Sequence, residues 1–313
     1  SLVHGSGSDC MKGLDHLPWY RRPGVTISLF LAPALFFFAL YVLAPIPVSF
    51  YYSLFRWDGI GERVFIGFQN WRELTQDPIF WRALKNNVTL VVISILVQLP
   101  MGIALALLLT SRFRWRKLLK TIYVLPYLMS AVAIGMLWRY IYEPTFGLLN
   151  MFLEAIGRSN WILDWLGDPK VVLYSVINAI NWQFIPFYML LFMAALVGIP
   201  DELYEAAKID GASAWKVFWT ITLPLLWPTV TNAAILSLVG SLKYFDLIHV
   251  LSGGGPSHAS ELMATYMYKR SFQHFRMGYG STVAVALFTI GFVLSMVFLR
   301  ATRCREYEGG GKR

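Results

Sequence analysis

The amino-acid sequence predicts an all-α integral membrane protein with six transmembrane helices. The 313 residues are 57% hydrophobic and 14% charged, whereas a soluble domain carries about a quarter charged residues. Six apolar runs reach or approach the roughly 20 residues that cross a bilayer as a helix, and apart from Arg139 they contain no Asp, Glu, Lys or Arg. Runs this long and this poor in charge exceed ordinary buried core helices. The six runs are 25–52, 88–109, 121–140, 171–199, 225–242 and 281–299.

The basic residues between the runs predict that both termini lie in the cytoplasm (N-in/C-in). Six spans place both ends of the chain on one side of the membrane, and that side carries an all-basic connector and a basic tail. The positive-inside rule makes it the cytoplasmic side, and the loop between the fourth and fifth spans lies there as well. The loop before the last run opposes the rule, because it should be external yet holds Lys269, Arg270 and Arg276. The cytoplasmic basic residues are Arg112, Arg114, Arg116, Lys117 and Lys120 in the connector and Arg300, Arg303 and Arg305 after the sixth run.

The chain divides into four parts on this interpretation. Residues 1–10 look like an expression scar before Met11, and residues 11–24 form a cytoplasmic N-terminal segment. Residues 25–300 form one six-span domain, and residues 301–313 form a cytoplasmic tail. The first apolar run is too long for a cleavable signal peptide and lacks a small-residue cleavage site.

The sequence holds no pattern typical of a catalytic centre. A phosphate-binding loop of the form G-x-x-x-x-G-K-[ST] is missing, and no Ser/His/acid or paired-carboxylate arrangement stands out. Cys10 and Cys304 lie near opposite ends and form no metal-ligand cluster with the few His residues. We therefore expect this chain to be no enzyme and to bind no metal or cofactor. Basic residues beside the membrane explain the net charge of +9, so we expect no nucleic-acid partner.

The loop 200–224 is polar and patterned although it lies between two apolar runs. It begins with a proline and an acid, which are typical of a helix start, and an amphipathic helix to Ile209 follows. Gly211 is expected to end that helix, because glycine tolerates the left-handed backbone. Ser213 is placed to cap a second short helix. Pro224 is then expected to turn the chain into the fifth run, since proline is tolerated at a helix start.

The same loop resembles the EAA loop of ABC importer permeases. That pattern has E-A-A, three residues, G, nine residues and then I-x-L-P, and all seven fixed positions match here. The resemblance implies a cytoplasmic coupling helix that docks into a cleft on a partner ATPase. Glu205 would anchor a basic group of the ATPase, the alanines would enter the cleft, and the proline would stiffen the junction with the next span. The implied coupling residues are Glu205, Ala206, Ala207, Asp210, Gly211, Ile221, Leu223 and Pro224.

Other motifs resemble the carbohydrate-uptake (MalF-like) permeases of binding-protein-dependent ABC importers. Phe245 and Asp246 are followed by an apolar stretch and GGGP at 253–256, and GFQNW occupies 67–71. The resemblance covers about 25–299 and implies a permease of a bacterial or archaeal cytoplasmic (inner) membrane that translocates a sugar or oligosaccharide. The implied partners are a second homologous permease, two ATPase subunits that bind ATP and Mg, an extracytoplasmic solute-binding protein and membrane lipid.

Uncharged polar side chains within the spans are candidates for the solute path. An amide in lipid is costly unless it is paired, so these side chains should face the bundle interior or a cavity. Amides that bond hydroxyls, with aromatic faces that stack on sugar rings, suit a carbohydrate; the alternative is that the amides only hold helices together. Three amides of the fourth run cannot share one narrow helix face, which favours the second role for some of them, and Pro186 is expected to kink this run. The candidates are Asn178, Asn181, Trp182, Gln183, Tyr188, Asn232 and Ser237.

Three other functions stay open on the sequence alone. The same machinery could carry glycerol phosphate, a polyol or an acidic oligosaccharide. A self-sufficient carrier or channel would work without an ATPase, but the runs lack the ionisable residue that usually carries a coupling ion. An integral membrane enzyme would need a catalytic cluster within the membrane, which the sequence does not indicate.

Overall fold

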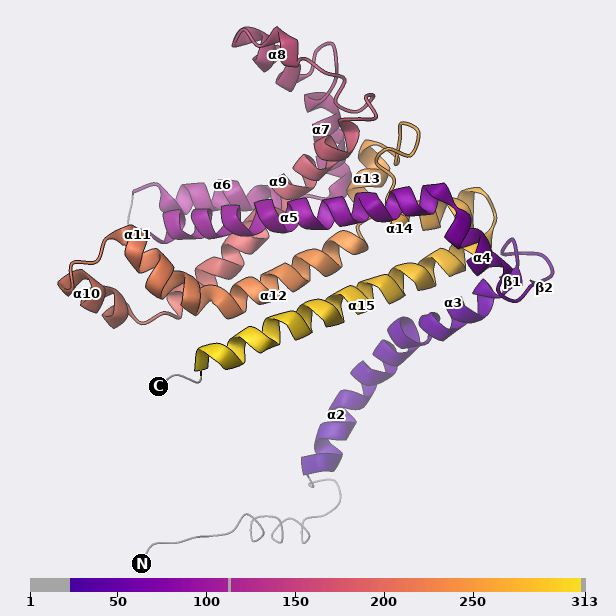
Figure 1. Cartoon of the computed structure of the whole chain (residues 1–313), viewed down its shortest axis with the longest axis horizontal. Helices are drawn as coiled ribbons and strands as arrows, with labels where there is room; N and C mark the ends of the chain where they lie inside the picture. Colours follow the sequence, from indigo (N-terminus) through magenta and orange to yellow (C-terminus); the bar gives the residue numbers. More distant parts are fainter. Residues whose placement is uncertain (1–22, 112–113, 311–313) are drawn as a thin grey trace, which may run out of the picture.

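The computed structural model describes the backbone of residues 23–111 and 114–310, and the side chains of residues 28–302 apart from 112–113. Residues 1–10, which we interpreted as a scar, and residues 11–22 lie outside the described part. So do the side chains of Cys10, Arg112, Arg303, Cys304 and Arg305. The described chain is a bundle of long helices with shorter elements at its ends (Figure 1).

Five helical stretches of the described chain are long and apolar enough to cross a membrane, and a bent helix pair makes a sixth if it is counted as one span. The predicted class, a helical membrane protein with about six spans, is therefore confirmed. The stretches are α2 (Pro23–Phe38) with the π turn η2 (Ala39–Leu43) and α3 (Pro45–Ser53); α5 (Pro78–Thr110); α9 (Val172–Val197); α11 (Ala214–Val217) with η4 (Phe218–Thr222) and α12 (Leu223–Leu242); and α15 (Met277–Gly310). The bent pair is α6 (Arg116–Leu128) and α7 (Ala131–Ile141).

The third run, 121–140, is not the single span that the sequence predicts. α6 and α7 meet at an angle of 102°. Ser130 begins α7 as its N-cap, because its Oγ accepts a hydrogen bond from the backbone N–H of Ala133 at 3.2 Å. α7 then packs closely on α13 (Asp246–Leu251), where a Cβ added to Gly135 would lie 2.6 Å from Cγ1 of Val250. The third run bends because Ser130 caps a new helix in its middle and because α7 packs on α13.

The second span begins at Pro78 rather than at Val88, so the predicted start is ten residues late. Asp77 caps the helix by accepting a hydrogen bond from the N–H of Ile79 at 2.9 Å, and the proline occupies the first helical position. The added turns contain polar side chains that are buried against other elements. The amide of Asn87, for example, donates at 3.0 and 3.2 Å to carbonyl oxygens at the end of α12. Hydropathy could not detect these turns because their polar groups are paired within the protein.

Pro224 does not begin a separate helix, contrary to the prediction. α11, η4 and α12 form one continuous helical stretch from Ala214 to Leu242. Proline lacks the N–H for a helical bond and its ring crowds the carbonyl four residues earlier. Phe218–Thr222, which end two residues before the proline, widen into a π turn, in which the N–H of Leu223 bonds the carbonyl of Phe218. The wider turn accommodates the proline, so the helix continues. α9 likewise runs without a break through Pro186.

The loop between the first two spans is folded. It contains the short antiparallel strands β1 (Phe55–Arg56) and β2 (Val64–Phe65), in which Phe55 lies opposite Phe65, and the helix α4 (Gln69–Gln76). Within the GFQNW motif, the amide of Asn70 donates to the carbonyl oxygens of Ser53 at 2.8 Å and Phe55 at 2.9 Å. The motif therefore ties the end of the first span to α4.

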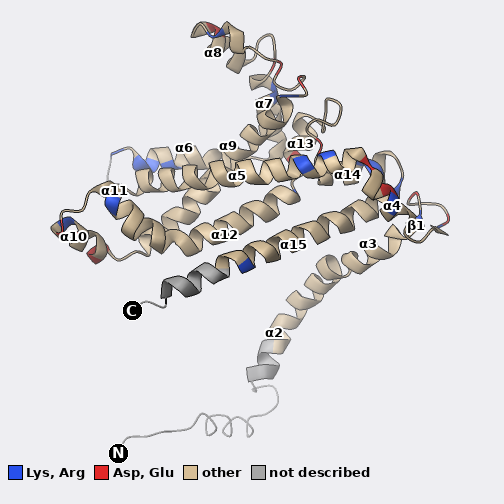
Figure 2. Ribbon diagram, in the orientation of Figure 1, with Lys and Arg blue, Asp and Glu red and all other residues tan. Residues whose placement is uncertain are grey.

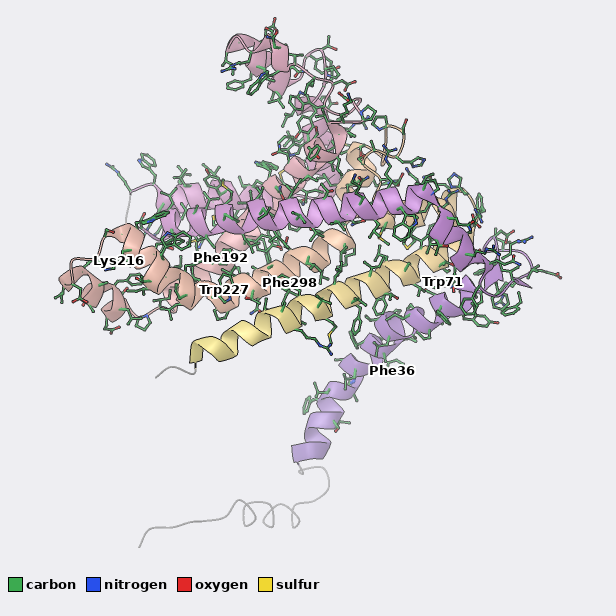
Figure 3. The ribbon with its side chains drawn as sticks, viewed as in Figure 1. Phe36, Trp71, Phe192, Lys216, Trp227 and Phe298 are labelled. Atoms are coloured by element: carbon green, nitrogen blue, oxygen red, sulfur yellow. The ribbon has the colours of Figure 1, made fainter. Side chains whose placement is uncertain are left out.

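α5 and α9 form the centre of the bundle, with α6 and α12 packed against them. Gly102 of α5 lies so close to α9 that an added Cβ would be 2.9 Å from Cβ of Tyr188. Met189 and Phe192 of α9 are completely buried beside this contact, and Figure 3 labels the phenylalanine within the bundle. The close approach of two helix backbones at a glycine is typical of packing within membranes.

The first half of the first span stands away from the other helices (Figure 1). Among the more extensive contacts between elements of the described chain, α2 packs on its own continuation η2 alone. Its apolar side chains are exposed, including Phe30 at 80% and Leu29 at 71%. A helix that is apolar all round is normally covered by lipid or protein, so this segment has surface for another membrane helix.

Charged residues gather at the ends of the bundle and leave its middle apolar (Figure 2). α10 (Asp201–Ile209) lies at one end, together with α11 and the start of α6 (Figure 1). The hairpin and α4 lie at the other end, near α14 (Met263–Tyr268), η5 (Lys269–Gln273) and the start of α15, while α8 (Leu148–Ala155) and η3 (Ser159–Trp161) follow the outward-pointing α7.

Candidate functional site

A cavity of about 180 Å³ lies where α5, α6, α9 and α12 meet. Five of its eleven lining residues are aromatic, and none of the eleven is charged. The ring of Tyr127 lies 6.1 Å from that of Phe184 and 5.4 Å from that of Phe187 between centroids. The ring of Tyr244 lies 5.8 Å from that of Phe184. The lining residues are Gln98, Tyr127, Ile180, Phe184, Phe187, Tyr188, Leu236, Ser237, Gly240, Ser241 and Tyr244.

A buried chain of hydrogen bonds joins three spans beside this cavity. Gln98 of α5 donates from Nε2 to Oδ1 of Asn181 on α9 at 2.9 Å. Ser237 of α12 donates from Oγ to Oε1 of Gln98 at 3.1 Å. All three side chains are buried, so each bond satisfies a polar group that would otherwise be unpaired in an apolar interior. The chain fixes the relative positions of the helices that form the cavity wall.

The structure separates the predicted path residues into groups. Tyr188 and Ser237 line the cavity, and Asn181 adjoins it through Gln98. Asn232 lies on the exposed surface of α12.

The other three path residues contact side chains around the cavity or further along α9. Gln183 accepts a hydrogen bond from the hydroxyl of Tyr244 at 3.0 Å, and Asn178 donates to the hydroxyl of Tyr142 at 3.1 Å. The ring of Trp182 packs edge-on against Trp138 at 5.7 Å. The three amides of α9 thus have three different partners, as expected for side chains on different helix faces.

Sequence reasoning missed most of the aromatic residues of the cavity. Phe184, Phe187 and Tyr188 follow the i, i+3, i+4 spacing that places side chains on one helix face, and this spacing could have revealed the α9 wall. Tyr127 and Tyr244 come from segments distant in sequence, so no spacing pattern could link them to this wall.

The coupling-loop residues lie in the helix–turn–helix that the sequence predicts. α10 ends in a Schellman motif, because the N–H of Gly211 bonds the carbonyl of Lys208 at 3.1 Å and the N–H of Ala212 bonds that of Ala207 at 2.9 Å. Gly211 has a φ of +71°, in the left-handed region that favours glycine. Ser213 then caps α11 by accepting from the N–H of Lys216 at 3.3 Å.

One face of α10 is free for a partner. Glu205, Ala206 and Asp210 are exposed, whereas Ala207 is buried. The hydroxyl of Tyr204 lies 3.3 Å from that of Thr222 in η4, so α10 is tied directly to the helix that continues into α12. Further along, Ile221 and Leu223 are half-buried and Pro224 is exposed. A force on α10 would therefore reach the fifth span through a short, hydrogen-bonded turn.

The opposite end of the bundle holds a cluster of charged and tyrosyl side chains that sequence reasoning did not single out. Oδ2 of Asp77 accepts hydrogen bonds from the hydroxyls of Tyr266 and, at 2.5 Å, Tyr279. Arg270 donates to the Tyr266 hydroxyl at 2.8 Å. Burial alone would raise the pKa of Asp77, but hydrogen bonds from the two tyrosines and from the N–H of Ile79 and the following residue outweigh it and lower the pKa. Burial also raises the pKa of Tyr266 to about 12.

We expect Asp77→Asn to destabilise the protein by about 1–3 kcal/mol at neutral pH, because the tyrosyl hydroxyls lose a charged acceptor. A carboxylate whose pKa is lowered in the folded state stabilises the protein at pH values above its unfolded pKa of about 3.9, and this contribution is lost progressively as the pH falls below that value and through the lower pKa of the folded state. Thermal unfolding in detergent should therefore show a smaller loss of stability on acidification in Asp77→Asn than in the wild type. Asp164→Asn, at an exposed loop acid, is the control, and equal pH dependence of Asp77→Asn and wild type would contradict the prediction.

The basic residues that opposed the positive-inside rule are neutralised in the fold. Lys269 lies 2.5 Å from a carboxylate oxygen of Glu261, which is completely buried. Arg276 binds Glu73 through two hydrogen bonds of 2.7 and 2.6 Å, and Arg270 lies 3.9 Å from the carboxylate of Asp77. These three basic side chains are therefore paired with acids and contribute little unpaired positive charge to this loop. Glu261 also fits under Gly254 of the GGGP loop, where an added Cβ would lie 2.6 Å from Oε2.

Comparison with known proteins agrees with this arrangement. Residues 98–302 match the family described as binding-protein-dependent transport system inner membrane component. The chain is 39% identical over 283 residues to the probable ABC transporter permease protein YurN of Bacillus subtilis, covering 90% of this chain and 97% of the relative. It is 34% identical over 282 residues to the trehalose/maltose transport system permease protein MalF of Thermococcus litoralis, covering 89% and 94%.

A solved structure has the same fold. A bacterial ABC transporter involved in the import of the acidic polysaccharide alginate aligns with a TM-score of 0.78 at 26% identity, covering 91% of this chain and 96% of the matched chain. The same kind of transporter in complex with an alginate pentasaccharide-bound periplasmic protein aligns with a TM-score of 0.77.

The family match, the relatives and the solved fold define this chain as an integral membrane permease subunit of an ABC transporter. This chain belongs to the family of binding-protein-dependent transport system inner membrane components. The resemblance inferred from the EAA-like and GGGP motifs is thereby confirmed.

Proposed function

We propose that this chain forms part of the path by which an ABC importer moves an uncharged sugar or oligosaccharide across the cytoplasmic membrane. The observation that carries the proposal is the central cavity, with five aromatic residues and no charged residue among those that line it. Aromatic faces stack on sugar rings. Sugar hydroxyls would bond Ser241 and the donor and acceptor capacity that Gln98 and Ser237 keep beyond their own hydrogen bonds. Relatives named for trehalose/maltose, lactose and starch degradation products support the class of substrate.

The cavity favours an uncharged solute over the alternatives that carry charge. Glycerol phosphate or an acidic oligosaccharide would require basic groups along the path, and the eleven lining residues include none. The volume of about 180 Å³ lies below the roughly 300–1,000 Å³ of a complete ligand pocket. We infer that a second, homologous permease supplies the rest of the wall. The exposed apolar surface of α2 supports a partner helix in the membrane.

The energy for transport would come from two ATPase subunits that bind ATP and Mg, and α10 would be their docking element. Glu205, Ala206 and Asp210 give α10 an exposed face, and the turn at Gly211 holds α10 against the helix that contains Ile221, Leu223 and Pro224. This role places α10 in the cytoplasm with both termini, an orientation that the unpaired basic residues near α6 support. The permease domain would then comprise residues 25–300, with cytoplasmic segments at 11–24 and 301–313.

A solute-binding protein would deliver the sugar at the opposite end, where β1, β2, α4 and α14 lie. The solved complex of a related transporter with its periplasmic protein supports this partner. Transport then requires that ATP and the loaded binding protein both favour the conformation that opens outward, because a ligand shifts an equilibrium only by its difference in affinity for the two states.

ATP hydrolysis by the assembled transporter in lipid tests the proposed function. The loaded binding protein should stimulate hydrolysis with an uncharged sugar and not with glycerol phosphate, a polyol or an acidic oligosaccharide. Stimulation by an acidic oligosaccharide alone would show that the substrate is acidic and would exclude an uncharged sugar. Solute flux that persists without ATP would show that the protein is a self-sufficient carrier and not part of an ATP-driven importer.

Tyr127→Ala should lower sugar transport about tenfold, because the ring that completes the aromatic wall is lost and each such contact contributes about 0.5–1.5 kcal/mol. Tyr123→Ala is the matched control, since Tyr123 lies one turn earlier on α6, is exposed and does not line the cavity. Uptake of labelled sugar at equal amounts of assembled transporter measures both. Equal uptake by the two variants would exclude Tyr127 from the path.

A further inference from the structure

A second, wholly apolar cavity of about 560 Å³ opens on the side of the bundle between α5 and the α11–η4–α12 helix. Ala104 and Leu107 lie on one wall, and Trp215 and Trp219 lie on the other. The two tryptophans are 72% and 51% exposed. The cavity is therefore a groove that other molecules in the membrane can reach. It is separate from the central cavity, with which it shares no lining residue.

Basic side chains of α6, of the residues just before it and of α11 cluster at the end of the bundle where this groove lies. Figure 2 shows them on the first turns of α6 and on α11, and Figure 3 labels Lys216 there. All of them are exposed, and none forms an ion pair with any side chain that the structure describes between residues 28 and 302. The cluster consists of Arg114, Arg116, Lys117, Lys120 and Lys216.

The groove and the cluster are close along the chain. Leu107 lies in the last turn of α5, which ends at Thr110, and the cluster begins four residues later at Arg114. Lys216 is next to Trp215 on the opposite wall. The groove extends from there along α5 to Pro100, which is about 10 Å at 1.5 Å per residue. Apolar surface toward the middle of the span thus continues into positive charge at its end.

We propose that this groove binds an anionic phospholipid of the bilayer, with an acyl chain between α5 and α11–η4 and the headgroup phosphate among Lys117, Lys120 and Lys216. Basic residues at the end of membrane helices attract anionic headgroups, and tryptophan is enriched where acyl chains meet headgroups. A second permease chain would cover the apolar groove equally well, but an anionic phospholipid carries both an acyl chain for the groove and a phosphate for the basic cluster in one molecule. Charge complementarity therefore selects the lipid.

Such a lipid would contact the helix that links α10 to the fifth span. The groove wall includes Phe218 and Trp219 of η4, the π turn that precedes Pro224. An acyl chain between η4 and α5 would brace this widened turn. The lipid would thereby influence the segment that we assign to coupling, although its binding does not depend on that assignment.

Native mass spectrometry of the full chain in detergent tests the proposal, with phosphatidylglycerol and phosphatidylcholine offered in equal amounts. The wild type should retain phosphatidylglycerol at least tenfold over phosphatidylcholine. A triple variant, Lys117→Gln, Lys120→Gln and Lys216→Gln, should lose this preference, since each basic residue contributes about fivefold. Ala104→Phe should lower retention of both lipids, because its ring fills the groove while the charges stay.

Lys243→Gln is the matched control. Lys243 is also exposed and also borders an apolar cavity, but that cavity lies between α12 and α15, so the preference should not change. Equal retention of the two lipids by the wild type would overturn the proposal, as would a preference that survives in the triple variant or retention that survives in Ala104→Phe. Loss of the lipid when the chain is assembled into the complete transporter would show that a protein partner occupies the groove. None of these measurements requires transport, so they are independent of the proposed function.

Discussion

Glu205→Lys is expected to abolish ATP-dependent uptake while the chain remains folded. Glu205 is exposed on α10 and has no hydrogen bond or ion pair with another described side chain, so its replacement removes no internal contact. If it pairs with a basic group on an ATPase subunit, reversal of its charge places two like charges in the interface. Loss of one partner of a buried charge pair costs about 2–5 kcal/mol, so ATPase binding should weaken about 30-fold or more.

Co-purification of the ATPase and uptake of labelled sugar measure this effect, and thermal unfolding of the isolated chain confirms the fold. Glu202→Lys provides the control, because it makes the same charge reversal on the same short helix, at a position outside the EAA pattern. It should reduce stability by about 0.3–1 kcal/mol through the helix dipole and leave coupling intact. If Glu205→Lys couples normally, or if both variants lose ATPase binding and uptake equally, then Glu205 has no specific role in coupling.

Gly102→Ala is expected to destabilise the protein by about 1–3 kcal/mol, the usual cost of an added methyl group in a packed interior. The new Cβ would lie 2.9 Å from Cβ of Tyr188 and 3.2 Å from the backbone nitrogen of Met189. The second atom belongs to the backbone, so α5 and α9 have to separate. Gln98 lies one helical turn away, and the separation should weaken its hydrogen bond with Asn181 and reduce transport as well.

Gly240→Ala is the matched control in α12, because no heavy atom lies within 4 Å of the position of its Cβ. Alanine favours a helix over glycine by roughly 0.8–1 kcal/mol, so this variant should be neutral or slightly more stable. Thermal unfolding of both variants in the same detergent gives the comparison. A Gly102→Ala protein as stable as Gly240→Ala would contradict the close contact between α5 and α9.

Local features of the chain were predictable because they depend on neighbouring residues. The spans follow from apolar length, and the turn at Gly211 follows from a helix with a glycine after its C-terminus and a serine cap beyond it. The turn and the fourth span appear with nearly the predicted bounds, whereas the second span starts earlier and the third is bent. The EAA-like spacing is equally local, and the family that it indicates is the one to which the chain belongs.

Where the prediction failed, contacts between distant segments outweighed the local pattern. The third run bends between α6 and α7, where α7 packs on α13. The second span begins at Pro78 because Asn87 in its polar turns finds hydrogen-bond partners at the end of α12 and the start of α14. At Pro224 the prediction of a new helix was wrong for a local reason: a π turn accommodates the proline, so the helix continues.

The sequence by itself determined the class of protein, the approximate positions of the spans, and the helix–turn–helix at Gly211, because hydropathy, capping and motif spacing are read along the chain. Only the tertiary structure decided which side chains share a cavity and which charges are neutralised. Tyr127 and Tyr244 meet the α9 wall from segments far apart in sequence, and Lys269 finds its acid in the buried Glu261. The physical reason is that a helix presents several faces, and packing alone determines which face meets another helix, a cavity or lipid.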